Sequence, residues 1–156
     1  MDFFRSQFRE LAEKIAADIR HAEGVQGRRN ITVIVEDTGT VENEVAEALS
    51  VAGICIIIGV TGFRRVSQSG PVIIGPVSLE FRVIERPSVN RNEQGFITTQ
   101  QMTEWLIKNL HWRTWEGMNG KPLLFQDFQR DDTDNCNISR VNFSGEYSLG
   151  MVIKEK

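Results

Sequence analysis

The chain has 156 residues, the length of one domain, and 40% of them are apolar and 25% charged. Its 18 basic and 21 acidic residues give a net charge of −3 at pH 7, which argues against a dedicated nucleic-acid-binding domain because such a domain needs a basic surplus. Two cysteines are too few for a disulfide framework. The longest apolar run, residues 54–60, is too short to cross a membrane. We therefore expect a reduced cytosolic chain without a membrane anchor.

The apolar residues favour a sheet. The chain contains 15 isoleucines and 14 valines but only 8 leucines. Side chains branched at Cβ suit the pleated surface of a sheet, whereas a helical bundle is usually rich in leucine. The ratio predicts a mixed protein organised around a sheet.

The first predicted element is a helix over residues 2–22. Its apolar residues recur at spacings of three and four, which places them on one helical face; they are Phe4, Phe8, Leu11, Ile15, Ile19 and Ala22. Gly24 is expected to end the helix. We interpret the stripe as the face that docks on the sheet; an arm that packs on a neighbouring subunit is the alternative.

A strand, a helix and a second strand are predicted next. The first strand covers residues 31–35, and the helix that follows is capped by Thr40 and stopped by Gly53. The apolar run 54–60 shows no alternation, which indicates a strand covered on both faces. This order is compatible with a crossover unit whose two strands are parallel.

Residues 61–70 are expected to form an exposed loop or the tip of a hairpin. A long strand follows over residues 71–86, with apolar and polar side chains alternating. Gly75 and Pro76 should break its ladder, so we expect a bend or bulge there. Residues 88–95 are predicted to be a polar loop.

The last third of the chain is predicted to contain a helix and a hairpin. Thr98 and Gln101 match a capping box at the start of the helix. Strands over 123–128 and 137–149 flank an acidic turn, which predicts an antiparallel hairpin. The expected fold is one α/β (α+β) domain over residues 1–150 with a mixed sheet, a crossover helix, helices packed on the sheet and a C-terminal β-hairpin. Residues 151–156 are expected to be a C-terminal tail.

No pattern of residues indicates a cofactor or a catalytic nucleophile, and no cofactor is expected. Glu36 and Asp37 at a strand end, together with Glu80, are the best metal-site candidates. A metal-dependent nuclease also needs a nearby lysine, and Arg82 occupies the nearest position. A small metal-dependent enzyme that uses these three carboxylates therefore stays an alternative, and it predicts that they converge.

Five arginines between residues 63 and 91 face only two glutamates in the sequence, a local balance of +3. They are Arg64, Arg65, Arg82, Arg86 and Arg91. One interpretation is a solvated loop and strand face. The other is a basic patch that meets an acidic partner surface or passing DNA. These five residues are the candidate interaction residues.

Three segments carry a resemblance to a known family. They are Val-Ile-Glu-Arg-Pro-Ser-Val-Asn-Arg (83–91), Leu-His-Trp (110–112) about twenty residues later, and Val-Asn-Phe-Ser-Gly-Glu-Tyr-Ser-Leu (141–149). With the order of the predicted elements, they make roughly residues 1–150 resemble the tail terminator (tail completion) proteins of long-tailed bacteriophages and prophages.

The resemblance implies a structural protein of the virion tail that is not an enzyme and that assembles in the host bacterial cytoplasm. Proteins of that family have an α/β fold with a mixed sheet, form a homohexameric ring, cap the tail tube and face the head–tail connector. The expected partners are thus further copies of the chain, the tube protein and the connector protein; DNA can pass without sequence-specific binding. Another head–tail joining or minor tail protein is the alternative within the same class.

Overall fold

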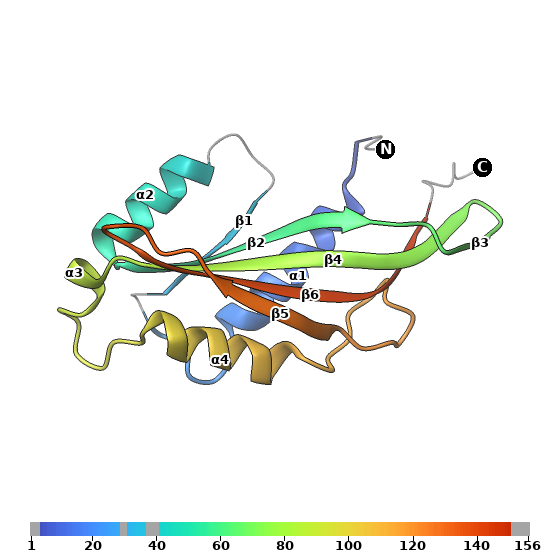
Figure 1. Ribbon diagram of the computed structural model, residues 1–156. Helices are drawn as coiled ribbons and strands as arrows, with labels where there is room; N and C mark the ends of the chain where they lie inside the picture. The colour runs from blue at the N-terminus through green and yellow to red at the C-terminus, as the bar shows by residue number, and fades with distance from the viewer. Residues whose placement is uncertain (1–3, 29–30, 37–40, 151–156) are drawn as a thin grey trace.

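The computed structural model describes residues 4–28, 31–36 and 41–150, which form one α+β domain around a mixed six-stranded sheet (Figure 1). The helices are α1 (Gln7–Arg20), α2 (Val41–Val51), α3 (Pro87–Asn90) and α4 (Thr99–Leu110). The strands are β1 (Thr32–Val35), β2 (Ile54–Phe63), β3 (Ser67–Ser69), β4 (Val72–Glu85), β5 (Leu124–Arg130) and β6 (Asn137–Leu149). The expected fold class is confirmed. No helix in the described part of the chain is long and apolar enough to span a membrane.

The main strands follow the order β1-β2-β4-β6-β5, and β3 pairs with β4 beside the end of β2. β1 and β2 are parallel and are joined through α2, as the crossover prediction requires. The other pairs are antiparallel, including the predicted C-terminal hairpin of β5 and β6.

The predicted break at Gly75 and Pro76 is wrong for the ladder between β4 and β6, whose register runs unshifted from Ile73 to Glu85. The register shift lies instead in β2, between Val60 and Gly62. Gly75 has a different role, because a Cβ atom at this position would lie 1.6 Å from the carbonyl oxygen of Arg64. The glycine therefore lets the connection from β2 to β3 pass against the backbone of β4.

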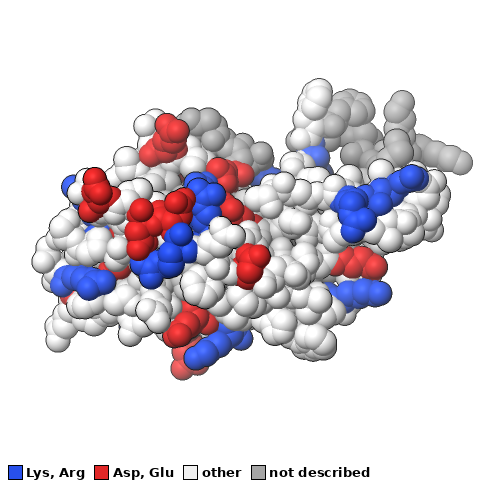
Figure 2. All heavy atoms as spheres, in the orientation of Figure 1, with Lys and Arg blue, Asp and Glu red and all other residues white. Residues whose placement is uncertain are grey.

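Helices cover the two faces of the sheet unequally. α1 and α4 bury one face, where the core contains the largest apolar side chains of the three central strands, among them Ile56, Phe81 and Phe143. α2 covers only one end of the opposite face, over Ile34, Cys55, Ile57 and Ile84. The rest of that face carries polar side chains of β4 and β6, and Figure 2 shows acidic and basic groups interspersed over part of it.

The helix termini follow local rules. α1 begins after Ser6, whose side chain accepts a hydrogen bond from the amide of Arg9. The helix thus starts later than predicted, and Phe4 lies outside it with 95% of its surface exposed. α4 begins at the predicted capping box of Thr98 and Gln101. The expected cap at Thr40 lies outside the described residues.

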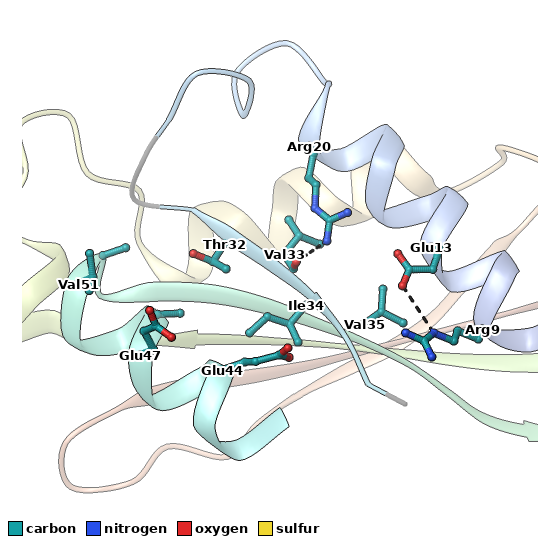
Figure 3. Close-up of a pocket in the computed structure, with 12 residues that line it drawn as sticks. Arg9, Glu13, Arg20, Thr32, Val33, Ile34, Val35, Glu44, Glu47 and Val51 are labelled. Carbon is teal, nitrogen blue, oxygen red and sulfur yellow. Dashed lines mark hydrogen bonds and ion pairs between the residues drawn. The ribbon is translucent and has the colours of Figure 1, made fainter. Parts of the chain in front are cut away.

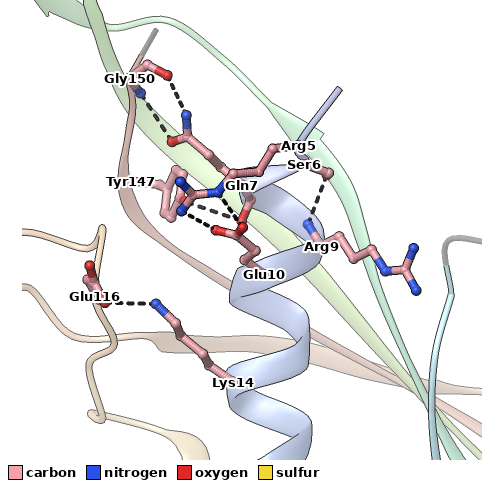
Figure 4. A network of polar contacts seen from close by, with 9 residues as sticks. All are labelled: Arg5, Ser6, Gln7, Arg9, Glu10, Lys14, Glu116, Tyr147 and Gly150. Carbon is pink, nitrogen blue, oxygen red and sulfur yellow. Dashed lines mark hydrogen bonds and ion pairs between the residues drawn. The ribbon is translucent and has the colours of Figure 1, made fainter. Parts of the chain in front are cut away.

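The start of α1 is fastened to the end of β6 (Figure 4). The side chain of Gln7 exchanges two hydrogen bonds with the backbone of Gly150, and the hydroxyl of Tyr147 donates to the carbonyl of Gln7 at 3.3 Å. Further along, Lys14 forms an ion pair with Glu116 at 2.8 Å. α1 therefore docks on the sheet of its own chain.

Two predicted loops contain regular structure. Residues 61–70 were predicted to be either a loop or the tip of a hairpin, and they form a hairpin. β2 extends to Phe63, and a turn that contains Gly70, at a φ of +58°, joins β3 to β4. Pro87 was predicted to end the strand and residues 88–95 to form a polar loop, but residues 87–90 form the one-turn helix α3, with Pro87 in its first turn. Proline is favoured there because the first amides of a helix have no intrahelical partner.

Candidate functional site

The five candidate arginines do not form one patch. Arg64 and Arg65 lie in the exposed connection between β2 and β3, where Figure 2 shows basic side chains at the end of the molecule opposite α2. Arg86 and Arg91 flank α3 at the other end of β4. The backbone of Arg64 bonds to Pro76, nine strand residues from Glu85, so roughly 30 Å of strand separates the groups. The candidate residues therefore lie in separate groups along the surface and not in one patch.

Arg82 lies between these groups and is engaged within its own chain. Its guanidinium forms ion pairs with Glu36 at 2.8 Å and with Glu80 at 3.5 Å. Its side chain is a quarter exposed. Arg82 therefore organises the polar face of the sheet.

Two of the three carboxylates proposed for a metal site are the partners of Arg82. The third, Asp37, lies outside the described residues. Among the residues that the structure places, no group of three or more histidines, cysteines and acids could hold a metal ion. Glu36 and Glu80 thus do converge, and what lies between them is a guanidinium.

At the far end of β4, Glu85 is a buried polar centre that the sequence interpretation missed. Its carboxylate is fully buried and accepts hydrogen bonds from the Asn90 amide at 2.7 Å and the Thr99 hydroxyl at 2.9 Å. The backbone amide of Thr99, the guanidinium of Arg91 and the amide of Asn137 are further donors, at 3.3–3.4 Å. The carboxylate therefore joins β4 to α3, α4 and β6.

These donors control the charge of Glu85. Burial by itself would raise the pKa of the carboxyl group, but hydrogen bonds from Asn90, Arg91 and Thr99 outweigh burial and lower the pKa. Glu85 is therefore ionised inside the fold at neutral pH. The alternation along β4 contained a signal for its position, because Glu85 shares the parity of the core residues Phe81 and Val83.

A groove follows the outer edge of β1, between α1 and α2 (Figure 3). Its volume is about 480 Å³. Among the strands of the described chain, none pairs with this edge. We call the groove the β1 groove; its lining includes Arg20, Val33, Val35, Glu44, Glu47 and Val51.

The backbone of β1 presents hydrogen-bonding groups to this groove. The backbone amide of Glu36 donates to the Ile58 carbonyl of β2. By alternation, the backbone N–H and C=O groups of Val33 and Val35 therefore point away from β2. Arg20 of α1 donates to the Val33 carbonyl at 2.6 Å, which agrees with that orientation. The edge is thus recessed between two helices, with only part of its bonding capacity used.

The walls of the β1 groove differ in charge. On α1, Arg9 lies 3.8 Å from Glu13 in an i,i+4 ion pair. On α2, Glu44 and Glu47 have no basic partner within the described residues. Arg20 on α1 adds a positive charge that bonds to the Val33 carbonyl, so the charged side chains of the lining sum to −1, with the acidic groups of the excess on α2.

The comparisons with known proteins give no further assignment: neither protein-family models nor curated proteins match this chain.

Proposed function

We propose that this protein is a tail terminator of a bacteriophage or prophage, a structural protein that assembles into a homo-oligomeric ring, caps the tail tube and joins it to the head–tail connector. The observation that carries the proposal is the agreement between the fold that the resemblance implies and the fold of the chain. Both have a mixed sheet with helices packed on it. A shared fold allows many functions, so the assembly itself must be tested.

The segment with the strongest resemblance has a structural role in this chain. Within residues 83–91, Glu85 and Asn90 are buried and bonded to each other, and Arg86 donates its amide to the Gly53 carbonyl at 2.6 Å. The polar groups of the segment hold elements together. The segment therefore supports the resemblance as a feature of the fold, and its polar groups have a structural role.

The ends of the sheet also support assembly. β1 and β5 are the two outer strands, and each has one edge that no described strand covers. Open edges tend to pair with other chains unless they are blocked. Phe128 of β5 is half exposed, and Trp112, close to the start of β5, is 70% exposed. A neighbouring copy that pairs with β5 would also cover this apolar area.

Ring formation and tube capping are the two activities to measure. We expect light scattering after size exclusion to detect an oligomer, either of the protein alone at micromolar concentration or after addition of tail tubes. We also expect the protein to bind tube ends and to stop their elongation. A chain that stays monomeric in both conditions and leaves tube growth unchanged contradicts the proposal.

The head–tail joining alternative differs in its partner. A tail terminator should retain both the tube protein and the connector protein in a pull-down. Retention of the connector alone would favour a head–tail joining protein.

A further inference from the structure

We propose that the tip of the β2–β4 hairpin of one copy docks in the β1 groove of the next copy, with Arg64 and Arg65 opposite Glu44 and Glu47. This inference rests on the proposed function, because it specifies the contact that would link the copies of the ring. We call residues 64–71 the hairpin tip. The partner is thus a second copy of this chain.

The hairpin tip carries charges opposite in sign to the acidic side chains of α2 in the β1 groove. Arg64 and Arg65 are exposed, and no acidic residue occurs in the sequence between Glu47 and Glu80. Arg65 bonds to the Gln68 side chain at 3.0 Å, and neither arginine has an acidic partner in the described part of the chain. Among the residues that the structure describes, two arginines without an acidic partner at one end of the molecule therefore match two glutamates of α2 without a basic partner in the β1 groove.

The tip also carries an open strand edge. Ser69 pairs with Val72 across the two-residue turn of Gly70 and Pro71, so the backbone groups of Ser67 and Ser69 face β4 and those of Gln68 point away from it. All three residues of β3 are exposed. β3 can thus offer β1 the outward main-chain groups of Gln68, so a strand contact at this edge would be short and side chains would supply its specificity.

Exposed apolar side chains accompany both partners. Val66 beside β3 is 65% exposed, and Val51 at the end of α2 is 74% exposed. Val66 follows Arg65 in the hairpin tip, and Val51 lies one helical turn after Glu47 on α2. The contact would therefore cover apolar area as well as oppose charges.

The geometry makes this contact intermolecular. Val35 of β1 pairs with Ile58 of β2, which is twelve residues from Gly70, or about 40 Å along the strand. Figure 1 shows α2 and β3 at opposite ends of the molecule. A hairpin tip cannot reach the groove of its own chain, so the contact joins copies head to tail, which is the arrangement that can close a ring.

The shape of the groove also argues against pairing of two β1 edges. Each β1 edge is recessed between α1 and α2. Two recessed edges would bring these helices into collision before the strands met. A narrow protruding hairpin fits the groove without this obstacle.

Charge reversal tests the pairing. One variant, R64E/R65E, reverses the tip, and a second, E44R/E47R, reverses the groove. We expect each alone to weaken assembly at least tenfold, measured by sedimentation velocity with and without tail tubes, because like charges then face each other. We expect an equimolar mixture of the two variants, and a chain carrying all four substitutions, to recover assembly.

A matched control reverses exposed charges elsewhere. In E104R/K108E, both changes lie on the exposed face of α4, which packs on β4, β5 and β6, and assembly should equal that of the wild type. All changed residues are exposed, so melting temperatures should stay nearly constant. This separates loss of the contact from loss of the fold.

The outcomes distinguish this contact from the proposed function. A wild type that assembles, together with reversed variants that assemble equally well, overturns the contact and leaves the ring. Loss of assembly in both variants without recovery in the mixture or the fourfold variant also overturns the pairing. A wild type that neither assembles nor caps tubes overturns the proposed function and this inference with it.

Discussion

The side-chain amide of Asn90 donates a hydrogen bond of 2.7 Å to the carboxylate of Glu85, and both residues are completely buried. Asn90 also donates to the Ile97 carbonyl at 2.9 Å. The pair therefore fastens the end of β4 to α3 and to the segment that enters α4. Gly53 makes room for this junction, because a Cβ atom there would lie 2.3 Å from the Asn90 backbone nitrogen.

Replacement of Glu85 should destabilise the protein strongly. In Glu85→Gln, one acceptor oxygen becomes an NH2 group that faces the donors of Asn90 or Thr99. Leaving buried donors unsatisfied costs about 1–3 kcal/mol each, so we expect the free energy of unfolding to fall by about 3 kcal/mol. Urea denaturation measures this loss. The exposed control Glu93→Gln should change it by less than about 0.5 kcal/mol, and equal values for the two variants would show that the junction is dispensable.

The same carboxylate predicts a dependence of stability on pH. Because the pKa of Glu85 is lower in the folded chain than in the unfolded chain, ionised Glu85 stabilises the fold at neutral pH. This contribution is present above the unfolded pKa and is lost as the pH falls through the lower folded pKa. The stability difference between the wild type and Glu85→Gln should therefore narrow below about pH 4.3, the ordinary pKa of glutamate. A difference that stays constant in urea titrations between pH 7 and pH 3.5 would contradict the assignment.

Gly75 should be required for the crossing of the β2–β3 connection. In Gly75→Ala, the new methyl group would meet the Arg64 carbonyl oxygen at 1.6 Å, so the backbone must shift. We expect a lower melting temperature and weaker assembly, because the crossing supports the hairpin tip. Gly62→Ala is the matched control, since its Cβ atom would have no neighbour closer than 4.0 Å. Equal melting temperatures for the two variants would show that the crossing does not require glycine at position 75.

Cys55 should be chemically silent in the folded protein. Burial between the sheet and α2 raises the pKa of its thiol to about 12, so almost no thiolate is present at pH 8. Cys136 is only partly buried. A colorimetric thiol reagent should therefore modify one cysteine per native chain and two after unfolding. Rapid reaction of both cysteines in the native protein would show that Cys55 is accessible.

Periodicity and capping signals in the sequence determined most of the secondary structure. The stripe from Leu11 to Ile19 and the capping box at Thr98 depend on neighbours within four residues, so they are local properties. The unbroken apolar run at residues 54–60 likewise indicated a central strand. These signals sufficed for the fold class and for the parallel pair of β1 and β2.

Only the tertiary structure decided where the charged groups lie. Arg64 and Arg86 belong to the same group of arginines in the sequence, but β4 lies between them and places them at opposite ends of the molecule. In the sequence Glu85 is one more charged residue, and its carboxylate can be buried because three separate elements, α3, α4 and β6, supply its hydrogen-bond donors. The β1 groove likewise exists because α1 and α2 flank one strand edge. Local sequence encodes periodicity and caps, whereas ion pairs, buried charges and grooves depend on residues that only folding brings together.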